Sequence, residues 1–140
     1  MFFRYNFPGV IWSLFILVLI SLPQNDFPDA SFLHIPNLDK IVHFLLFLFL
    51  AILVARGFAL QSSSVTLKKY FSWLSVFIGI TYGAMTEILQ ATVFTWRSCS
   101  LFDFIADVIG CLAGIGFYLL ILKKIIPLPF RIKKLITGNQ

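Results

Sequence analysis

The sequence predicts an all-α protein, a four-helix transmembrane bundle with both termini in the cytoplasm. Of its 140 residues, 59% are hydrophobic and 12% are charged, about half the charged share of a soluble domain. A soluble domain of this length could not bury so much apolar surface. The apolar residues form continuous runs and do not alternate with polar ones, which favours spanning helices over membrane strands.

We expect a single domain, 1–140, made of four helices and a basic cytoplasmic tail, at about 7–22, 38–60, 70–91, 101–126 and 127–140. A spanning helix needs roughly 17–25 mostly apolar residues, so the last three segments are long enough and the first is short. The first segment could instead be a cleaved signal peptide, because Arg4 precedes its apolar core. The residues after it offer no small-x-small cleavage motif, which favours an uncleaved helix.

Charge placement predicts the orientation in the membrane. The first loop, 23–37, contains two aspartates and no basic residue, whereas the second loop and the tail are basic. Lys and Arg mark the cytoplasmic side, so both termini and the second loop are placed there. All of the 11 basic residues except Lys40 and Arg97 then face the cytoplasm, where the tail is expected to lie on anionic lipid headgroups. This placement explains the net charge of +5 without a nucleic-acid partner.

Polar residues recur at the outward ends of three predicted helices, which predicts one polar cluster in the outer leaflet. The candidate site comprises Asp39, Lys40, His43, Glu87, Gln90, Arg97, Asp103 and Asp107. Asp39 and His43 are four residues apart and share a helix face. Glu87 and Asp107 lie about a turn or more inside apolar segments. A charge there costs several kcal/mol unless it is paired or hydrated, so such residues mark functional sites by default.

Several of these residues also have ordinary structural explanations. Lys40 could extend its ammonium to the membrane interface, and Asp39 suits a helix start. Ser100 followed by Asp103 resembles a capping box, and a lone His43 is more often a hydrogen-bonded packing residue. The four carboxylates of the set outnumber its two basic side chains. The cluster is therefore net acidic unless one group takes up a proton or a cation binds.

Small residues continue the polar stripe of the last predicted helix. Gly110 and Gly114 follow Asp107 on the same face, where they would let another helix approach closely. Cys99 lies in a polar turn and Cys111 well inside an apolar segment, too far apart in depth to be bridged. We therefore expect no disulfide within the chain and no cysteine-based metal site. His and carboxylates could ligate a divalent metal, but no tight ligand spacing supports one, so the sequence predicts no metal and no cofactor.

Three motifs, taken together, resemble the VanZ-like family. They are DKIVHF from Asp39, EILQ from Glu87 and RSCSLFDFIADVIGCLAG at 97–114. The resemblance covers about 38–120 and implies a multi-pass protein of the bacterial cytoplasmic (inner) membrane. The family takes its name from a member linked to teicoplanin resistance, and membership implies no settled reaction. Asp107 stands where that family most often has Asn, so a carboxylate replaces a neutral amide.

Three functions follow from this pattern. The first is binding or modulation of a lipid-linked or amphiphilic envelope molecule, with Lys40, Arg97 and His43 holding a phosphate. The second is a membrane-embedded hydrolase or transferase that uses His43 with Asp39 or Glu87, although no nucleophile or metal motif is strong enough to assign catalysis. The third is a small ion- or proton-coupled transporter that works as an oligomer. Membrane lipids and a lipid-linked envelope precursor are the expected partners.

Overall fold

The computed structural model describes residues 2–22, 37–61, 64–94, 100–122 and 124. Within them, the elements are α1 (Phe2–Ser21), α2 (Leu38–Ala59), α3 (Val65–Lys69), α4 (Phe71–Thr92), α5 (Leu101–Phe117) and a π-helical turn, η2 (Tyr118–Leu122). Four helical segments are long and apolar enough to cross a membrane, the fourth running from α5 into η2. The predicted all-α class and four-helix bundle are confirmed, while the predicted tail, 127–140, lies outside the described residues.

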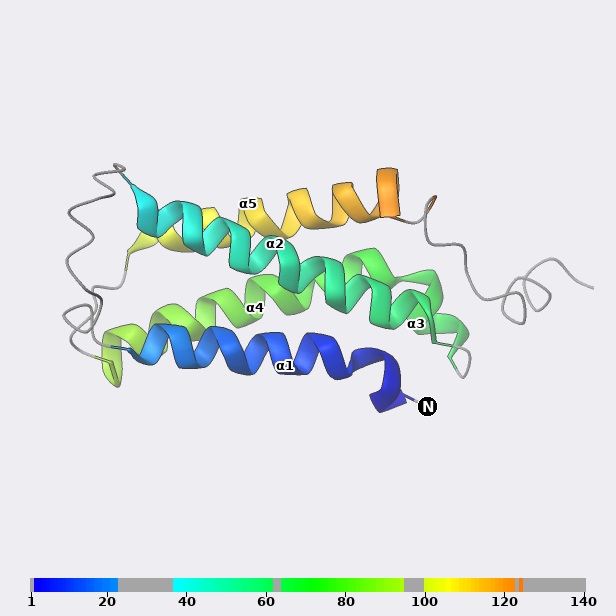
Figure 1. The fold of residues 1–140 in the computed structure, drawn as a ribbon, viewed down its shortest axis with the longest axis horizontal. Helices are drawn as coiled ribbons and strands as arrows, with labels where there is room; N and C mark the ends of the chain where they lie inside the picture. The colour runs from blue at the N-terminus through cyan, green and yellow to red at the C-terminus, as the bar shows by residue number, and fades with distance from the viewer. Residues whose placement is uncertain (1, 23–36, 62–63, 95–99, 123, 125–140) are drawn as a thin grey trace, which may run out of the picture.

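The four long helices lie side by side and alternate in direction (Figure 1). α1 ends, α2 begins, α4 ends and α5 begins at one end of the bundle, which we call the polar end. The start of α1, the short helix α3 and η2 lie at the opposite end. Among the described residues, every carboxylate lies in α2, α4 or α5 near the polar end, and Lys40 is the one basic residue there.

Two element boundaries differ from the predicted ones. α1 begins at Phe2, ahead of the predicted start, and includes Pro8. Proline has no N–H to donate within a helix and kinks it, and Figure 1 shows α1 bending near its N-terminal end. The α-helical part of the last segment ends at Phe117 and continues as η2. α3 was not predicted, because five residues are too few to leave a periodic pattern.

α2 is the most buried of the spanning helices and packs most extensively on α5. Glycines let the two backbones touch. A Cβ added to Gly110 would overlap the carbonyl oxygen of Phe44, and one added to Gly114 would overlap that of Leu48. Small residues at such positions are the usual means of close helix approach in a membrane. This contact fixes the rotation of α5 and turns its polar face toward α2.

A second pair of glycines, Gly79 and Gly83, brings α4 against α5. A Cβ on Gly79 would overlap the Cys111 sulfur, and one on Gly83 would lie 3.2 Å from Asp107 Oδ2. Glycines therefore line both contacts of α5. Gly110 and Gly114 of α5 itself face α2, and Gly79 and Gly83 of α4 face α5. The pairing places the side chain of Asp107 between α2 and α4.

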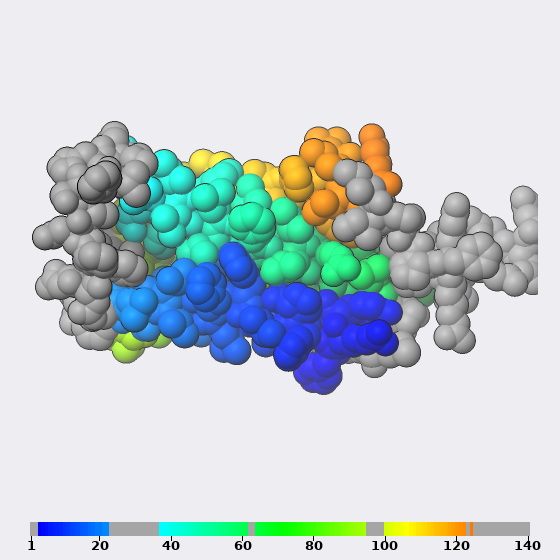
Figure 2. All heavy atoms as spheres, in the orientation of Figure 1, coloured from blue at the N-terminus to red at the C-terminus, as the bar shows by residue number. Residues whose placement is uncertain are grey.

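The outward faces of the bundle carry large apolar side chains. Trp73 is 78% exposed, Phe77 69% and Leu120 68%. Figure 2 shows α1 and α2 lying along one another over much of one face. In water such a surface would drive aggregation, whereas in a bilayer it contacts lipid chains. The exposed apolar faces and the lengths of the helices agree with a multi-pass membrane protein.

Candidate functional site

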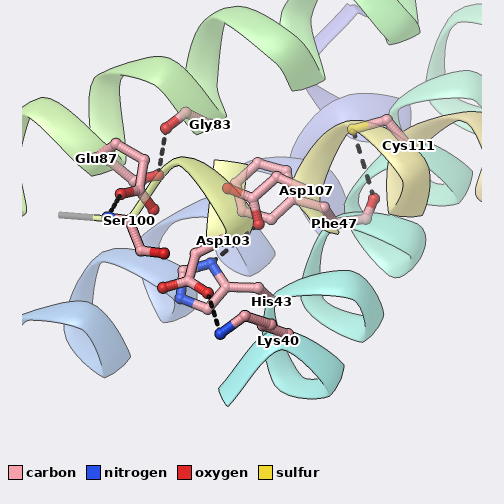
Figure 3. Close-up of polar contacts among 10 residues, drawn as sticks. Lys40, His43, Phe47, Gly83, Glu87, Ser100, Asp103, Asp107 and Cys111 are labelled. Atoms are coloured by element: carbon pink, nitrogen blue, oxygen red, sulfur yellow. Dashed lines mark hydrogen bonds and ion pairs between the residues drawn. The ribbon is translucent and has the colours of Figure 1, made fainter. Parts of the chain in front are cut away.

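The polar end brings together most of the residues that the sequence singled out (Figure 3). His43 comes from α2, Glu87 and Gln90 from α4, and Asp103 and Asp107 from α5; all five are buried. Lys40 and Asp39 lie nearer the surface, at the start of α2. Arg97 lies outside the described residues. The structure thus brings together residues from three helix ends, namely Asp39, Lys40, His43, Glu87, Asp103 and Asp107.

His43 and Asp107 form the centre of the cluster. The His43 Nδ1 and Asp107 Oδ1 atoms lie 3.0 Å apart, and the two residues are 3% and 0% exposed. They are 64 residues apart in the sequence, so only the close packing of α2 on α5 brings them together. The i,i+4 spacing pointed to Asp39 as the neighbour of His43, but the hydrogen-bonding partner is Asp107.

Glu87 ties the end of α4 to the start of α5. Its Oε2 atom accepts a hydrogen bond of 3.0 Å from the backbone N–H of Ser100, and Glu87 is only 6% exposed. Ser100 is the N-cap residue of α5, but its side chain makes no capping hydrogen bond, so the expected capping box is wrong. A carboxylate from another helix serves the α5 N-terminus instead, where its charge suits the helix dipole.

Lys40 and Asp103 form an ion pair at the rim of the cluster. The Lys40 Nζ and Asp103 Oδ1 atoms are 3.6 Å apart, with side chains 37% and 6% exposed. Lys40 therefore does more than reach for the membrane interface, because it balances a carboxylate on a neighbouring helix. This pair is neutral as a unit and leaves the deeper carboxylates without that countercharge.

Two deep carboxylate oxygens have no hydrogen-bond partner among the described residues: Glu87 Oε1 and Asp107 Oδ2. Asp103 Oδ1 is also buried without a hydrogen bond, although Lys40 lies near it. Leaving a buried acceptor unsatisfied costs about 1–3 kcal/mol, and more when it is charged. Such atoms are rare in folded proteins and call for a partner such as water, an ion or a ligand.

The floor of the cluster is formed by residues that sequence reasoning did not single out. Thr86 is fully buried, and its hydroxyl donates a hydrogen bond of 2.8 Å to the Gly83 carbonyl of its own helix. Phe47, 1% exposed, lies below His43 on α2, and its carbonyl oxygen is 3.9 Å from the Cys111 sulfur. The sequence signal that could have found this floor is Gly79, Gly83 and Glu87, spaced four residues apart on α4.

His43 is shared by two groups of potential ligands. The ligand atoms of Asp39, His43 and Asp103 all lie within 4.8 Å of one another, and so do those of His43, Glu87 and Asp107. Chemically, the cluster offers one imidazole, several carboxylate acceptors and one ammonium. It is suited to hold a cation, an amine or hydroxyl groups, with Lys40 available at the rim for an anion.

Comparisons with known proteins show which family the chain resembles. A model of the VanZ/LLP1 family matches residues 2–122. The chain is also 26% identical over 101 residues to the uncharacterized protein C11E3.10 of Schizosaccharomyces pombe (strain 972 / ATCC 24843). That similarity covers 72% of this chain and 57% of the yeast protein, so the chain spans little more than half the length of that relative. No solved structure matches the chain.

Proposed function

Since the chain is a multi-pass membrane protein that belongs to the VanZ/LLP1 family, we propose that it binds or modulates a lipid-linked or amphiphilic molecule of the cell envelope. The observation that carries this proposal is the polar end itself. Lys40 and Asp39 form its partly exposed rim, and His43, Glu87 and Asp107 lie buried behind them. Carboxylate oxygens without hydrogen-bond partners among the described residues lie behind this rim, and the hydroxyls or amines of a polar headgroup would satisfy them.

Apolar residues near the rim of the cluster suit the hydrocarbon chains of an amphiphile. Ile41 is 45% exposed, Leu101 70% and Phe102 67%, and all three lie in the first turns of the helices that carry the cluster. A molecule with its headgroup in the cluster would lay its chains against these side chains. The headgroup's hydroxyls or amines would donate to the carboxylates, while Lys40 would attract a phosphate.

The location that we propose is the bacterial cytoplasmic (inner) membrane, with the polar end in the outer leaflet. Its support is the distribution of charge. Arg4, Arg56, Lys68 and Lys69 all lie in elements that reach the opposite end of the bundle, and Lys and Arg mark the cytoplasmic side. Precursors of the bacterial envelope that are carried on lipids present their headgroups on the outer side, where this cluster would meet them.

The test is to identify the amphiphile that copurifies with the protein in mild detergent, by mass spectrometry of extracted lipids. Glu87→Gln and Asp107→Asn keep the side-chain shapes and remove one charge each. We expect either change to reduce the copurified amphiphile at least tenfold. Arg56→Gln removes a charge at the opposite end and should leave the bound amphiphile unchanged. Equal lipid content in all four proteins, with folding intact, would refute the proposal.

A membrane-embedded hydrolase or transferase is the second candidate, favoured by the contact between His43 and Asp107. A buried carboxylate 3.0 Å from an imidazole nitrogen can orient the ring and stabilise its protonated form during general base catalysis. Turnover of the copurified amphiphile by the wild-type protein, abolished in Asp107→Asn at normal abundance, would establish this activity. Unchanged substrate after long incubation would leave binding as the function.

A further inference from the structure

We propose that His43, Glu87 and Asp107 bind one divalent metal ion where α2, α4 and α5 meet at the polar end. The three residues are separated along the chain by more than 40 positions and by 20, so the sequence offered no ligand motif. The fold brings their nitrogen and oxygen atoms within 4.8 Å of one another. Figure 3 shows the three side chains converging from three helices.

The observed separation suits ligands of a common ion. Two ligands bound at about 2.1 Å and at right angles to each other lie about 3.0 Å apart, and His43 Nδ1 and Asp107 Oδ1 are 3.0 Å apart. An ion that binds both atoms takes the place of the proton they would otherwise share, since the ligand must be the unprotonated imidazole. A neutral imidazole that binds the ion through Nδ1 carries its proton on Nε2.

The unpartnered oxygens are an independent indication of a ligand. Glu87 Oε1 and Asp107 Oδ2 are both buried without a hydrogen-bond partner among the described residues. The other oxygen of Glu87, Oε2, is already held by the Ser100 N–H, while Asp107 Oδ1 faces His43 Nδ1. Glu87 is therefore anchored through one oxygen and open at the other, as metal ligands oriented by outer contacts are.

The charge of the three residues also matches a divalent cation. With a neutral imidazole, Glu87 and Asp107 bring two negative charges into a site that is 0–6% exposed. Buried charges are costly unless compensated, and Lys40 already pairs with Asp103 at the rim. A single proton would leave one negative charge, whereas a divalent ion neutralises both and satisfies the open oxygens together.

The ligand set narrows the class of ion. Imidazole suits zinc, copper, iron and nickel, while carboxylates alone suit magnesium, calcium and manganese. One imidazole with two carboxylates therefore favours Zn²⁺ or Mn²⁺. The second group, Asp39, His43 and Asp103, is a weaker candidate because Asp103 is engaged by Lys40 and Asp39 lies nearer the surface.

The ion would also help to hold the amphiphile of the proposed function. This role of the ion rests on the proposed function, whereas the binding of the ion does not. An ion with three protein ligands keeps at least one coordination position open. A phosphate of an anionic headgroup can occupy that position, which would reconcile a net-acidic cluster with an anionic ligand. The described residues provide only Lys40 as a positive group for such a headgroup, and the ion would supply the second.

The experiment uses full-length protein in detergent, stripped with chelator and free of added lipid. Isothermal titration with Zn²⁺ and with Mn²⁺, followed by metal analysis after gel filtration, measures binding by the metal alone. We expect about one ion per chain in the wild type. Glu87→Gln and Asp107→Asn should weaken binding at least about tenfold. Asp39→Asn, a loss of charge at the rim, should weaken it less than either, and Arg56→Gln, at the opposite end of the bundle, should leave it unchanged.

Several outcomes would overturn the site. Wild-type protein that retains neither ion overturns it without reference to any variant. Affinity unchanged in Glu87→Gln and Asp107→Asn, or lost in Asp39→Asn alone, assigns the ion to other residues. The lipid measurement is separate: metal binding without any copurified amphiphile would sink the proposed function and leave the ion site standing. An amphiphile retained equally with and without metal would refute the ion's role in binding it.

Discussion

The contact between α2 and α5 has two halves that differ in composition: one consists of small and apolar residues, and the other contains buried polar side chains. Toward the middle of the bundle, Gly110 and Gly114 press against the α2 backbone, and the surrounding side chains, such as Ala51 and Ile115, are small or apolar and buried. At the polar end, the same helix faces present His43 and Asp107, and Asp107 Oδ2 is buried without a hydrogen-bond partner among the described residues. The first half stabilises the bundle, and the second half is tolerated at a cost.

This difference separates the residues that hold the fold from those that use it. Close helix packing needs only small residues in register, and Gly110 and Gly114 provide it without contact to the cluster. The buried carboxylates add repulsion and desolvation. Substitutions in the two halves should therefore change stability in opposite directions, and the following experiments test that contrast.

The largest effect is expected from Gly110→Ala. Its new Cβ would overlap the Phe44 carbonyl oxygen, and backbone cannot move aside as a flexible side chain can. We expect a loss of about 1–3 kcal/mol in the free energy of unfolding, measured by titration of the purified protein from mild detergent into a denaturing one. Gly116→Ala is the matched control, because nothing lies within 4 Å of its added Cβ. Equal stability of the two variants would show that α2 and α5 are not held by this contact.

An increase in stability is expected from Asp107→Asn in metal-free protein. The amide keeps the shape of the carboxylate beside Gly83 and removes a buried charge that is incompletely paired. The Asn amide oxygen can still accept a hydrogen bond from His43, so we expect a gain of roughly 1–2 kcal/mol in the free energy of unfolding from the lost desolvation of the charge, measured in the same titration with a chelator present. Added Zn²⁺ or Mn²⁺ should stabilise the wild type and not the variant. A loss of stability in the metal-free variant would mean that the charge at Asp107 supports the fold.

The sequence predicted the bundle and the gathering of polar residues at one end of it because both follow from hydropathy. Long apolar runs specify spanning helices, and polar residues near the ends of three such helices come together where those ends meet. The resemblance to the VanZ-like family was confirmed by the family model. It could be predicted because its motifs are short runs of residues along one chain.

The partners within the cluster could not be predicted, because spacing along one helix identifies only neighbours on that helix. His43 pairs with Asp107 and Glu87 with Ser100, and both contacts depend on how α5 is rotated against α2 and α4. Gly79 and Gly83 help to set that rotation, yet they have no polar signal of their own. For the same reason the group formed by His43, Glu87 and Asp107 appeared only when the three helices were in place.

A smaller effect is expected at the rim, from Lys40→Gln. The Lys40 side chain is 37% exposed and lies 3.6 Å from Asp103, so water screens the pair and its loss should cost no more than about 1 kcal/mol. Copurified amphiphile should nevertheless fall if a phosphate is held at this side chain. Lys69→Gln, at the opposite end, controls for the general effect of a lost positive charge on lipid binding. A drop in bound amphiphile in Lys40→Gln alone would place the phosphate at the rim, whereas equal drops in both variants would reduce the lysine to a nonspecific attraction for anionic lipid. A large destabilisation in Lys40→Gln would mean that the rim of the cluster also stabilises the fold, so that the two halves of the contact between α2 and α5 would not differ in this respect.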